Sequence, residues 1–313
     1  MSGKYVTETL ESDERGIARA TALLREGGLV ALPTETVYGL AARADDAAAV
    51  ARIYEAKGRP SFNPLIVHVS SLEAAKRLAE FSPEAERLAQ EYWPGPLTLV
   101  LPRRKDAKLA EAVTAGLGTV ALRIPNHTIV RDILSSFDFP LAAPSANRSG
   151  FISPTSAAHV LASLDGRINA VIEGGECERG LESTIIAVRE DGMLEQLRPG
   201  PLDFDRLTQS VQPEGPVEAP GQLASHYAPG KPVRLDVIRS VEDEFYIGFG
   251  EVAGDSSLSL EGNLEEAASR LYACLHLAAK SEKPRIAIAP VPDTGLGTAI
   301  NDRLRRAATP PER

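Results

Sequence analysis

Apolar residues recur with two different periods along the first two hundred residues. Over 13–26 they return on one helical face and Gly27 follows as a C-cap, so a helix is predicted there. Residues 29–32 form a short apolar run, which is typical of a buried strand. By the same criteria, further helices are predicted over 46–57, 72–81 and 83–92, and further strands over 65–69, 97–101, 119–124, 141–143, 170–173, 183–188 and 194–197. This alternation predicts an α/β domain around a substantial sheet.

The pattern changes near Val211. Residues 211–231 are rich in proline and glycine and have no periodicity, which predicts a linker. Beyond it, strands are predicted over 233–237, 245–249 and 286–290, and helices over 264–280 and 300–308. A second, smaller α/β domain follows. The predicted division is 1–210, 211–231 and 232–313.

Composition narrows the class of protein. The chain has 313 residues, 43% of them hydrophobic, and a net charge of −9, so bulk charge argues against stable binding to nucleic acid. Its two cysteines, Cys177 and Cys274, form no disulfide framework, which favours a reducing compartment. No signal-peptide pattern or apolar run of about 18 residues is present, so we expect a cytoplasmic protein without a membrane span.

Common nucleotide and metal motifs are weak or missing. The sequence contains no G-x-x-x-x-G-K-[ST]. Residues 248–253 match G-x-G-x-x-A, but no helix pattern follows, so dinucleotide binding is not predicted there. The five histidines show no metal-ligand spacing, and no G-x-S-x-G elbow is present.

Polar side chains instead follow several predicted strands. The stretch 33–40, PTETVYGL, either presents hydroxyls to a small polar ligand or is a capped strand–helix loop. Lys57 and Arg59 lie at a helix end, where cations also favour the helix dipole. His68 faces away from the apolar side of its strand, and is either a ligand contact or a hydrogen-bonded strand residue. Arg123 lies inside an apolar strand and needs an anionic partner, either an internal carboxylate or a ligand.

The later strand ends repeat this theme. Residues 143–150 are rich in short hydrogen-bonding groups, and Ser153 and Pro154 are predicted to open a helix as N-cap and first-turn residues. Ser183 and Arg198 also lie at strand ends. Together these loops offer four basic residues and many hydroxyls, which predicts a cleft for a phosphate-bearing ligand at one edge of the sheet.

These stretches, in this order, resemble the YrdC-like threonylcarbamoyl-AMP synthase family in its long, two-domain form. The segments that carry the resemblance are PTETVYGL, KGRPSFNPLIVHV, WPGPLTLVL, ALRIP, PLAAPSANRSG, ESTII, LRPG, the linker APGQLASHYAP and VPDTGLGTAINDRL. The family implies a YrdC-like twisted open sheet with flanking helices, followed by a small Rossmann-like domain. Gln222 and Ala187 depart from the expected pattern at positions without a chemical role.

The resemblance also implies site residues. On the threonine side these are Thr36, His68, Arg123, Ser183 and the backbone at Ala143. ATP would be bound by Lys57, Arg59, Asn63, Thr119, Ser145, Asn147, Ser153 and Arg198, and His226 and Tyr227 of the linker would close over it. Lys57, Arg59 and Arg123 are the strongest candidates for a catalytic effect through positioning and electrostatics, without a protein nucleophile or a protein-bound metal.

The reaction implied by the family joins L-threonine, bicarbonate or CO2, and ATP, with Mg2+ arriving on the nucleotide. Its product would pass to enzymes that transfer the threonylcarbamoyl group to tRNA. Two alternatives remain open from the sequence: a non-catalytic module that binds nucleotide or double-stranded RNA, and a carbamoyltransferase-type domain. The latter occurs in chains with acylphosphatase and zinc-finger segments, which this sequence lacks.

Overall fold

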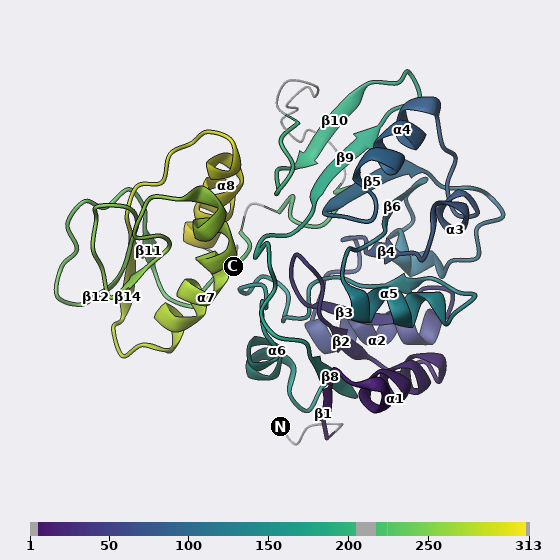
Figure 1. Ribbon diagram of the computed structural model, residues 1–313, viewed down its shortest axis with the longest axis horizontal. Coiled ribbons are helices and arrows are strands. Elements are labelled where there is room, and N and C mark those ends of the chain that lie inside the picture. The colour runs from purple at the N-terminus through teal and green to yellow at the C-terminus, as the bar shows by residue number, and fades with distance from the viewer. Residues whose placement is uncertain (1–5, 205–216, 224, 311–313) are drawn as a thin grey trace.

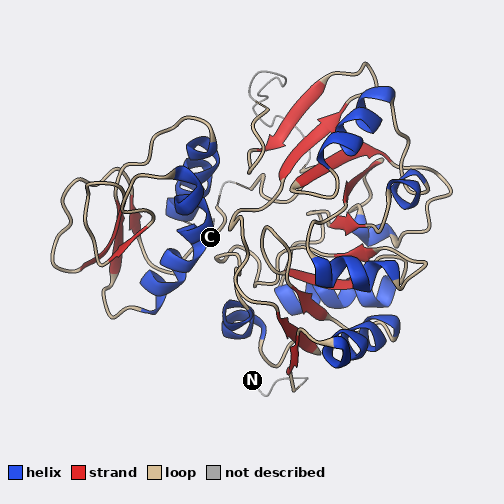
Figure 2. Cartoon of the chain, in the orientation of Figure 1, coloured by secondary structure: helices blue, strands red, loops and turns tan. Residues whose placement is uncertain are grey.

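The larger domain is built on one mixed, ten-stranded sheet in the order β1-β8-β2-β3-β7-β4-β6-β5-β9-β10 (Figure 1). The computed structural model describes residues 6–204, 217–223 and 225–310. The strands are β1 (Glu8–Glu11), β2 (Val30–Leu32), β3 (Gly39–Arg43), β4 (Ile66–His68), β5 (Leu97–Pro102), β6 (Thr119–Arg123), β7 (Leu141–Ala142), β8 (Ala170–Glu173), β9 (Thr184–Val188) and β10 (Leu194–Arg198). Figure 2 shows the strands passing through this domain with helices packed around them.

Five of the six α-helices described in this domain begin at an Asp or Ser side chain that accepts a backbone hydrogen bond. Asp13 accepts a hydrogen bond from the Gly16 N–H at the start of the first helix, and Gly58 ends the second in a left-handed conformation. The helices are α1 (Glu14–Arg25), α2 (Ala47–Lys57), α3 (Leu72–Lys76), α4 (Pro83–Tyr92), α5 (Thr128–Ser135) and α6 (Ala157–Leu164), with a 3-10 turn η1 at Glu111–Val113.

The alternation along β6 separates two layers. Val120 and Leu122 point into the main core, which also contains residues of α2 and α4. Arg123 and Ala121 point to the other face, which α1 and α5 cover over the strands nearest β1. Over β4, β6 and β9 of that face, Ala219 of the linker joins the apolar cluster. The ends of β4 and β6 therefore lie beside the linker.

The smaller domain has a four-stranded parallel sheet in the order β11-β14-β12-β13. Its elements are β11 (Val233–Arg234), β12 (Glu244–Gly248), β13 (Ser256–Ser257), α7 (Leu264–Lys280), β14 (Arg285–Ile288) and α8 (Leu296–Ala308). The two helices lie on the side of the small sheet that faces the larger domain (Figure 1). None of the helices in the described ranges is both long and apolar enough to cross a membrane.

The two domains share an apolar cluster. Val37, Ile152 and Leu181 of the larger domain pack in one cluster with residues of α7 and α8. At Gly180 the approach is very close, because a Cβ there would lie 2.4 Å from the Cα of Ser269 on α7. Only glycine fits this position, whose φ is +66°.

The predicted α/β fold with a second, smaller domain is confirmed, while several boundaries were wrong. The stretch 33–40 leads into strand β3 rather than a helix, because residues 39–43 pair with β2 and β7. The helix predicted over 72–81 ends at Lys76, since Ala79 forms a bridge with Arg103. Strand β1 and helix α5 were not predicted, and α8 begins four residues earlier than expected.

Ser153 is not a helix cap. The helix that follows it begins at Ala157, and Ser156 is its N-cap, accepting a hydrogen bond from the His159 N–H. Ser153 instead donates its hydroxyl to Glu182. The predicted linker at 211–231 lies partly outside the described residues, which omit 205–216 and 224.

Two stacked histidines at the domain boundary predict a pH-dependent stability. His159 and His276 lie with ring centroids 3.8 Å apart, and His276 Nε2 donates to the Ser153 carbonyl at 3.1 Å. Burial lowers the pKa of His159 to about 4 and of His276 to about 3, with a smaller contribution from neighbouring positive charge. Because the unfolded histidines titrate near 6.5, the unfolded chain binds more protons below about pH 6.5.

We therefore expect the unfolding midpoint to fall as the pH is lowered from 7 towards 4, with a shallower slope in His276→Gln. Differential scanning calorimetry across this range measures both slopes. Equal slopes for the two proteins would show that this pair does not carry the dependence.

Candidate functional site

A pocket lies beside the ends of β4 and β6, between the larger domain and the linker. The predicted site residues that line it are Thr36, Arg59, His68, Arg123, Ala143, Ser145, Ser183, Arg198, His226 and Tyr227. Segments that are distant in sequence, from Thr36 to Tyr227, thus supply one site, because the sheet order brings several strand ends together and the linker lies beside them.

Arg123 is buried and contacts three groups. Its Nη1 donates to Thr36 Oγ1 at 2.9 Å and its Nε donates to the Gly95 carbonyl at 3.2 Å. Its Nη2 lies 2.7 Å from Glu35 Oε1 as an ion pair without hydrogen-bond alignment. The anionic partner that the sequence required is therefore an internal carboxylate. A guanidinium has five N–H donors, so donors remain for a ligand carboxylate.

His68 lies on the same strand face as Ile66, pointing into the pocket. Burial lowers its pKa well below the ordinary value, and the nearby charge of Arg123 lowers the pKa further. The ring is therefore neutral. Its Nδ1 has no hydrogen-bond partner among the described residues, so this nitrogen is free to contact a ligand.

Lys57 and Arg59 are buried and are held by uncharged oxygens. Lys57 Nζ donates to the carbonyls of Ser145 at 2.6 Å and Asn147 at 2.5 Å. Arg59 donates to the Asn63 carbonyl and side-chain oxygens at 3.0 and 2.6 Å. Burial lowers the pKa of Lys57 well below its ordinary value and that of Arg59 to about 10.

Arg198 is held in a similar way. Its Nε and Nη2 donate to the Ser183 carbonyl at 3.1 and 2.9 Å, and Nη1 donates to the Pro220 carbonyl at 3.2 Å. Burial lowers the pKa of Arg198 as well. Among the described residues, these buried cations contact only carbonyl and hydroxyl oxygens, so no ion pair there compensates their charge. An anionic ligand would supply the missing counter-charge.

The linker closes this pocket. Pro220, Gly221, His226 and Tyr227 form its cover, and the remaining cavity measures about 40 Å³. That volume is far below the roughly 300–1,000 Å³ of sites for small-molecule ligands. Gln222 supports the cover, since its side-chain oxygen accepts from the N–H groups of residues 218 and 219 at 2.8 and 3.0 Å. A ligand of that size does not fit the cavity while Pro220, Gly221, His226 and Tyr227 lie in these positions.

The other predicted residues lie behind the pocket or away from it. Asn63 orients Arg59, Asn147 contacts Lys57 through its carbonyl, and Ser153 donates to Glu182. Thr119 begins β6 while Arg123 ends it, about 13 Å further along at 3.3 Å per residue. Thr119 therefore does not line this pocket, unlike Arg123 of the same strand.

Two buried carboxylates at the site were not predicted. Glu35 lies within PTETVYGL next to Thr36, and the need of Arg123 for an anion was a usable signal for it. Glu182 lines the pocket next to Ser183, and its partners Tyr272 and Arg303 are too distant in sequence for a local pattern to indicate.

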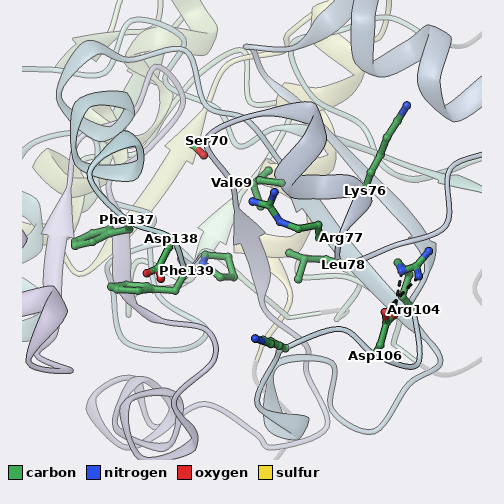
Figure 3. Close-up of a pocket in the computed structure, with 13 residues that line it drawn as sticks. Val69, Ser70, Lys76, Arg77, Leu78, Arg104, Asp106, Phe137, Asp138 and Phe139 are labelled. Carbon is green, nitrogen blue, oxygen red and sulfur yellow. Dashed lines mark hydrogen bonds and ion pairs between the residues drawn. The ribbon is translucent and has the colours of Figure 1, made fainter.

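A second cavity, of about 400 Å³, lies between α3 and the segment before β7 (Figure 3). Of its basic residues, Lys76 is paired with Glu86 and Arg104 with Asp106. Its two aromatic rings are already stacked on each other, 4.3 Å apart, so they offer mainly their edges. None of the predicted site residues lines it, and we place the candidate site at the smaller, buried pocket.

This fold and this pocket match a known class of protein. Residues 22–200 match the Sua5/YciO/YrdC family, described as "Telomere recombination", and residues 191–309 match the "Threonylcarbamoyl-AMP synthase, C-terminal domain". The chain therefore belongs to the Sua5/YrdC family of threonylcarbamoyl-AMP synthases, in its two-domain form.

Relatives and solved structures agree with this membership. The chain is 40% identical to threonylcarbamoyl-AMP synthase of Bacillus subtilis strain 168, over 97% of this chain and 96% of that protein. It superposes on Sua5 of Pyrococcus abyssi complexed with L-threonine with a TM-score of 0.85 and 38% identity, over 97% of both chains. Full-length HypF shares the fold alone, with a TM-score of 0.53 and 23% identity over 58% of this chain and 28% of that one.

Gly221 offers a test of the closed linker. Its φ is +90°, and an added Cβ would lie 2.8 Å from Arg198 Cδ and 3.2 Å from the Tyr227 hydroxyl. We expect Gly221→Ala to lower turnover by about tenfold or more, because the strained linker can no longer close over Arg198. Steady-state rates of pyrophosphate release measure the effect.

The matched control is Gly230→Ala, also in the linker. Its φ is +78°, but a Cβ there meets nothing within 4 Å. Equal rates for the two variants would attribute any loss to backbone strain alone and contradict the contact with Arg198.

Proposed function

We propose that this protein condenses L-threonine, bicarbonate or CO2, and ATP into L-threonylcarbamoyladenylate and pyrophosphate. The observation that carries the proposal is the set of buried cations, Lys57, Arg59 and Arg198, which contact only uncharged oxygens among the residues that the structure describes near the pocket. Triphosphate groups are the ligands that such a set fits. The relatives named threonylcarbamoyl-AMP synthase, and the L-threonine complex of one of them, support the same reaction.

In the proposed reaction the threonine amine attacks CO2 and loses a proton, which gives a carbamate. A carbamate oxygen then attacks the α-phosphorus of ATP, and the bond to the β-phosphate oxygen breaks to release pyrophosphate. Arg123, with Thr36 and neutral His68, would hold the amino acid. Alignment and charge neutralisation supply the catalysis, without a protein nucleophile.

The linker would protect the intermediate. A carbamate is labile in water, and closure of the pocket by the linker excludes water during transfer. His226 and Tyr227 are both buried in this closed arrangement. The linker would open for ATP and close again before the second step.

Magnesium would enter on the nucleotide. No group of three potential ligands, His, Cys, Asp or Glu, is assembled among the residues the structure describes. The two carboxylates near the pocket are engaged, Glu35 by Arg123 and Glu182 by Arg303. The described side chains therefore do not form a protein cage for Mg2+. We propose that the product passes to enzymes that modify tRNA.

Pyrophosphate release tests the proposal. With purified protein, ATP and Mg2+, we expect release that requires both threonine and bicarbonate, and formation of the adenylate by mass spectrometry. Absence of release would favour a nucleotide- or RNA-binding module, which a gel shift against tRNA across salt concentrations would examine.

Arg123→Ala should abolish threonine-dependent release, because it removes the proposed carboxylate contact. A charge-assisted, bidentate contact of this kind corresponds to roughly a 100-fold loss or more. Arg131→Ala, which removes an exposed arginine of α5, is the control.

Since Arg123 also neutralises Glu35, thermal unfolding is recorded for each variant, and Arg123→Lys preserves the charge without the bidentate geometry. Near-normal activity of a folded Arg123→Ala protein would overturn this assignment.

A further inference from the structure

Helices of the C-terminal domain contact one carboxylate that lines the pocket, Glu182 of the larger domain. This side chain lines the pocket and is 5% exposed. Ser153 donates to Oε1 at 2.5 Å, the Tyr272 hydroxyl lies 2.8 Å from Oε2, and Arg303 Nε donates to Oε2 at 3.0 Å. Tyr272 belongs to α7 and Arg303 to α8, so two helices of the second domain contact a wall residue of the site in the first.

Arg303 also contacts the linker. Its side chain is fully buried, and Nη1 donates to Asp302 at 2.9 Å. The guanidinium carbon lies 5.5 Å from the ring centre of Tyr227, whose ring in turn lies 5.6 Å from that of Tyr272. One cation therefore touches both the wall and the cover of the pocket.

The charges at this contact are coupled to the proposed phosphate site. Burial alone would raise the pKa of Glu182, but the charges of Arg303 and Arg198 and the hydrogen bonds from Ser153 and Tyr272 lower this pKa to about 2. Glu182 is therefore ionised. Arg303 forms an ion pair with Glu182 at 3.0 Å, and Arg198 acts on it as a second nearby positive charge. Without Arg303, the negative charge of Glu182 would fall mainly on Arg198.

This interaction of Glu182 with Arg198 would weaken the binding of ATP. Arg198 donates to the carbonyl of Ser183, the residue next to Glu182. In the proposed reaction Arg198 binds the phosphates of ATP. A buried carboxylate left without its own counter-ion would compete with the phosphates for Arg198. It would also repel them directly.

We infer that Arg303 and Tyr272 of the C-terminal domain are positioning residues of the ATP site. They neutralise and orient Glu182 from behind, which leaves Arg198 available to phosphate and holds Tyr227 over the pocket. This inference rests on the proposed function. The close approach of Gly180 to α7 provides the fixed docking that such an action requires.

The test uses the full-length protein with Arg303→Met and Tyr272→Phe. We expect Arg303→Met to raise the KM for ATP by about tenfold or more and to lower kcat, with the KM for threonine changed less than about threefold. Tyr272→Phe removes one hydroxyl donor and should show a smaller change in the same direction. Arg305→Met, an exposed position of the same helix, is the control.

The double variant Glu182→Gln/Arg303→Met separates charge from packing. It contains no uncompensated carboxylate, so the KM for ATP should recover most of the way from the value of Arg303→Met to that of the wild type. Calorimetric titration with ATP gives the same comparison without turnover. Thermal unfolding of each variant reports any general loss of structure.

Different results would reject the synthase reaction and the positioning role of Arg303. Wild-type protein without threonine-dependent pyrophosphate release rejects the synthase reaction. Wild-type turnover combined with an unchanged KM for ATP in Arg303→Met rejects the positioning role. If Arg303→Met does not fold, Tyr272→Phe decides: a KM for ATP equal to that of wild type overturns the inference.

Discussion

The site depends on buried cations that form no ion pair with a carboxylate of the described residues. Lys57, Arg59 and Arg198 lie at 2, 8 and 4% exposure and contact carbonyl and hydroxyl oxygens. Removing such charges from water costs several kcal/mol each, and neutral oxygens compensate only part of it. The rest of the fold must therefore hold them rigidly until an anion enters. Strand-end loops anchored to the sheet provide this rigidity.

Much of this arrangement could be predicted from the sequence, because it follows from local patterns. Strand alternation placed His68 on the face opposite its apolar neighbours, and the burial of Arg123 required an anion. The sequence could not indicate whether the anionic partner of Arg123 is a ligand or an internal carboxylate. In the structure this partner is Glu35. The loop at 33–40 was equally ambiguous, since its continuation as β3 involves pairing with the neighbouring β2 and also with β7, a strand about a hundred residues away.

Errors concentrate where distant segments decide the outcome. Serine is a residue type typical of helix N-caps, yet the Ser153 hydroxyl donates to Glu182, and Ser156 caps the helix instead. The partners of Glu182 on α7 and α8 lie 90 and 121 residues away along the chain. No periodicity or short motif encodes a contact of that range, because it depends on how two domains dock.

The small volume of the closed pocket is related to the presence of the second domain. In the proposed reaction the site must admit ATP, a large polyanion, and afterwards exclude water, so its cover would have to move and then return to one position. A linker alone returns to many positions, because chain entropy opposes a single one. Tyr227 gains a defined position through its contacts with Arg303 and Tyr272, both anchored in a domain with its own core. In the proposed arrangement the C-terminal domain thus holds the cover in one position, and the surface by which this domain docks contributes to the active site.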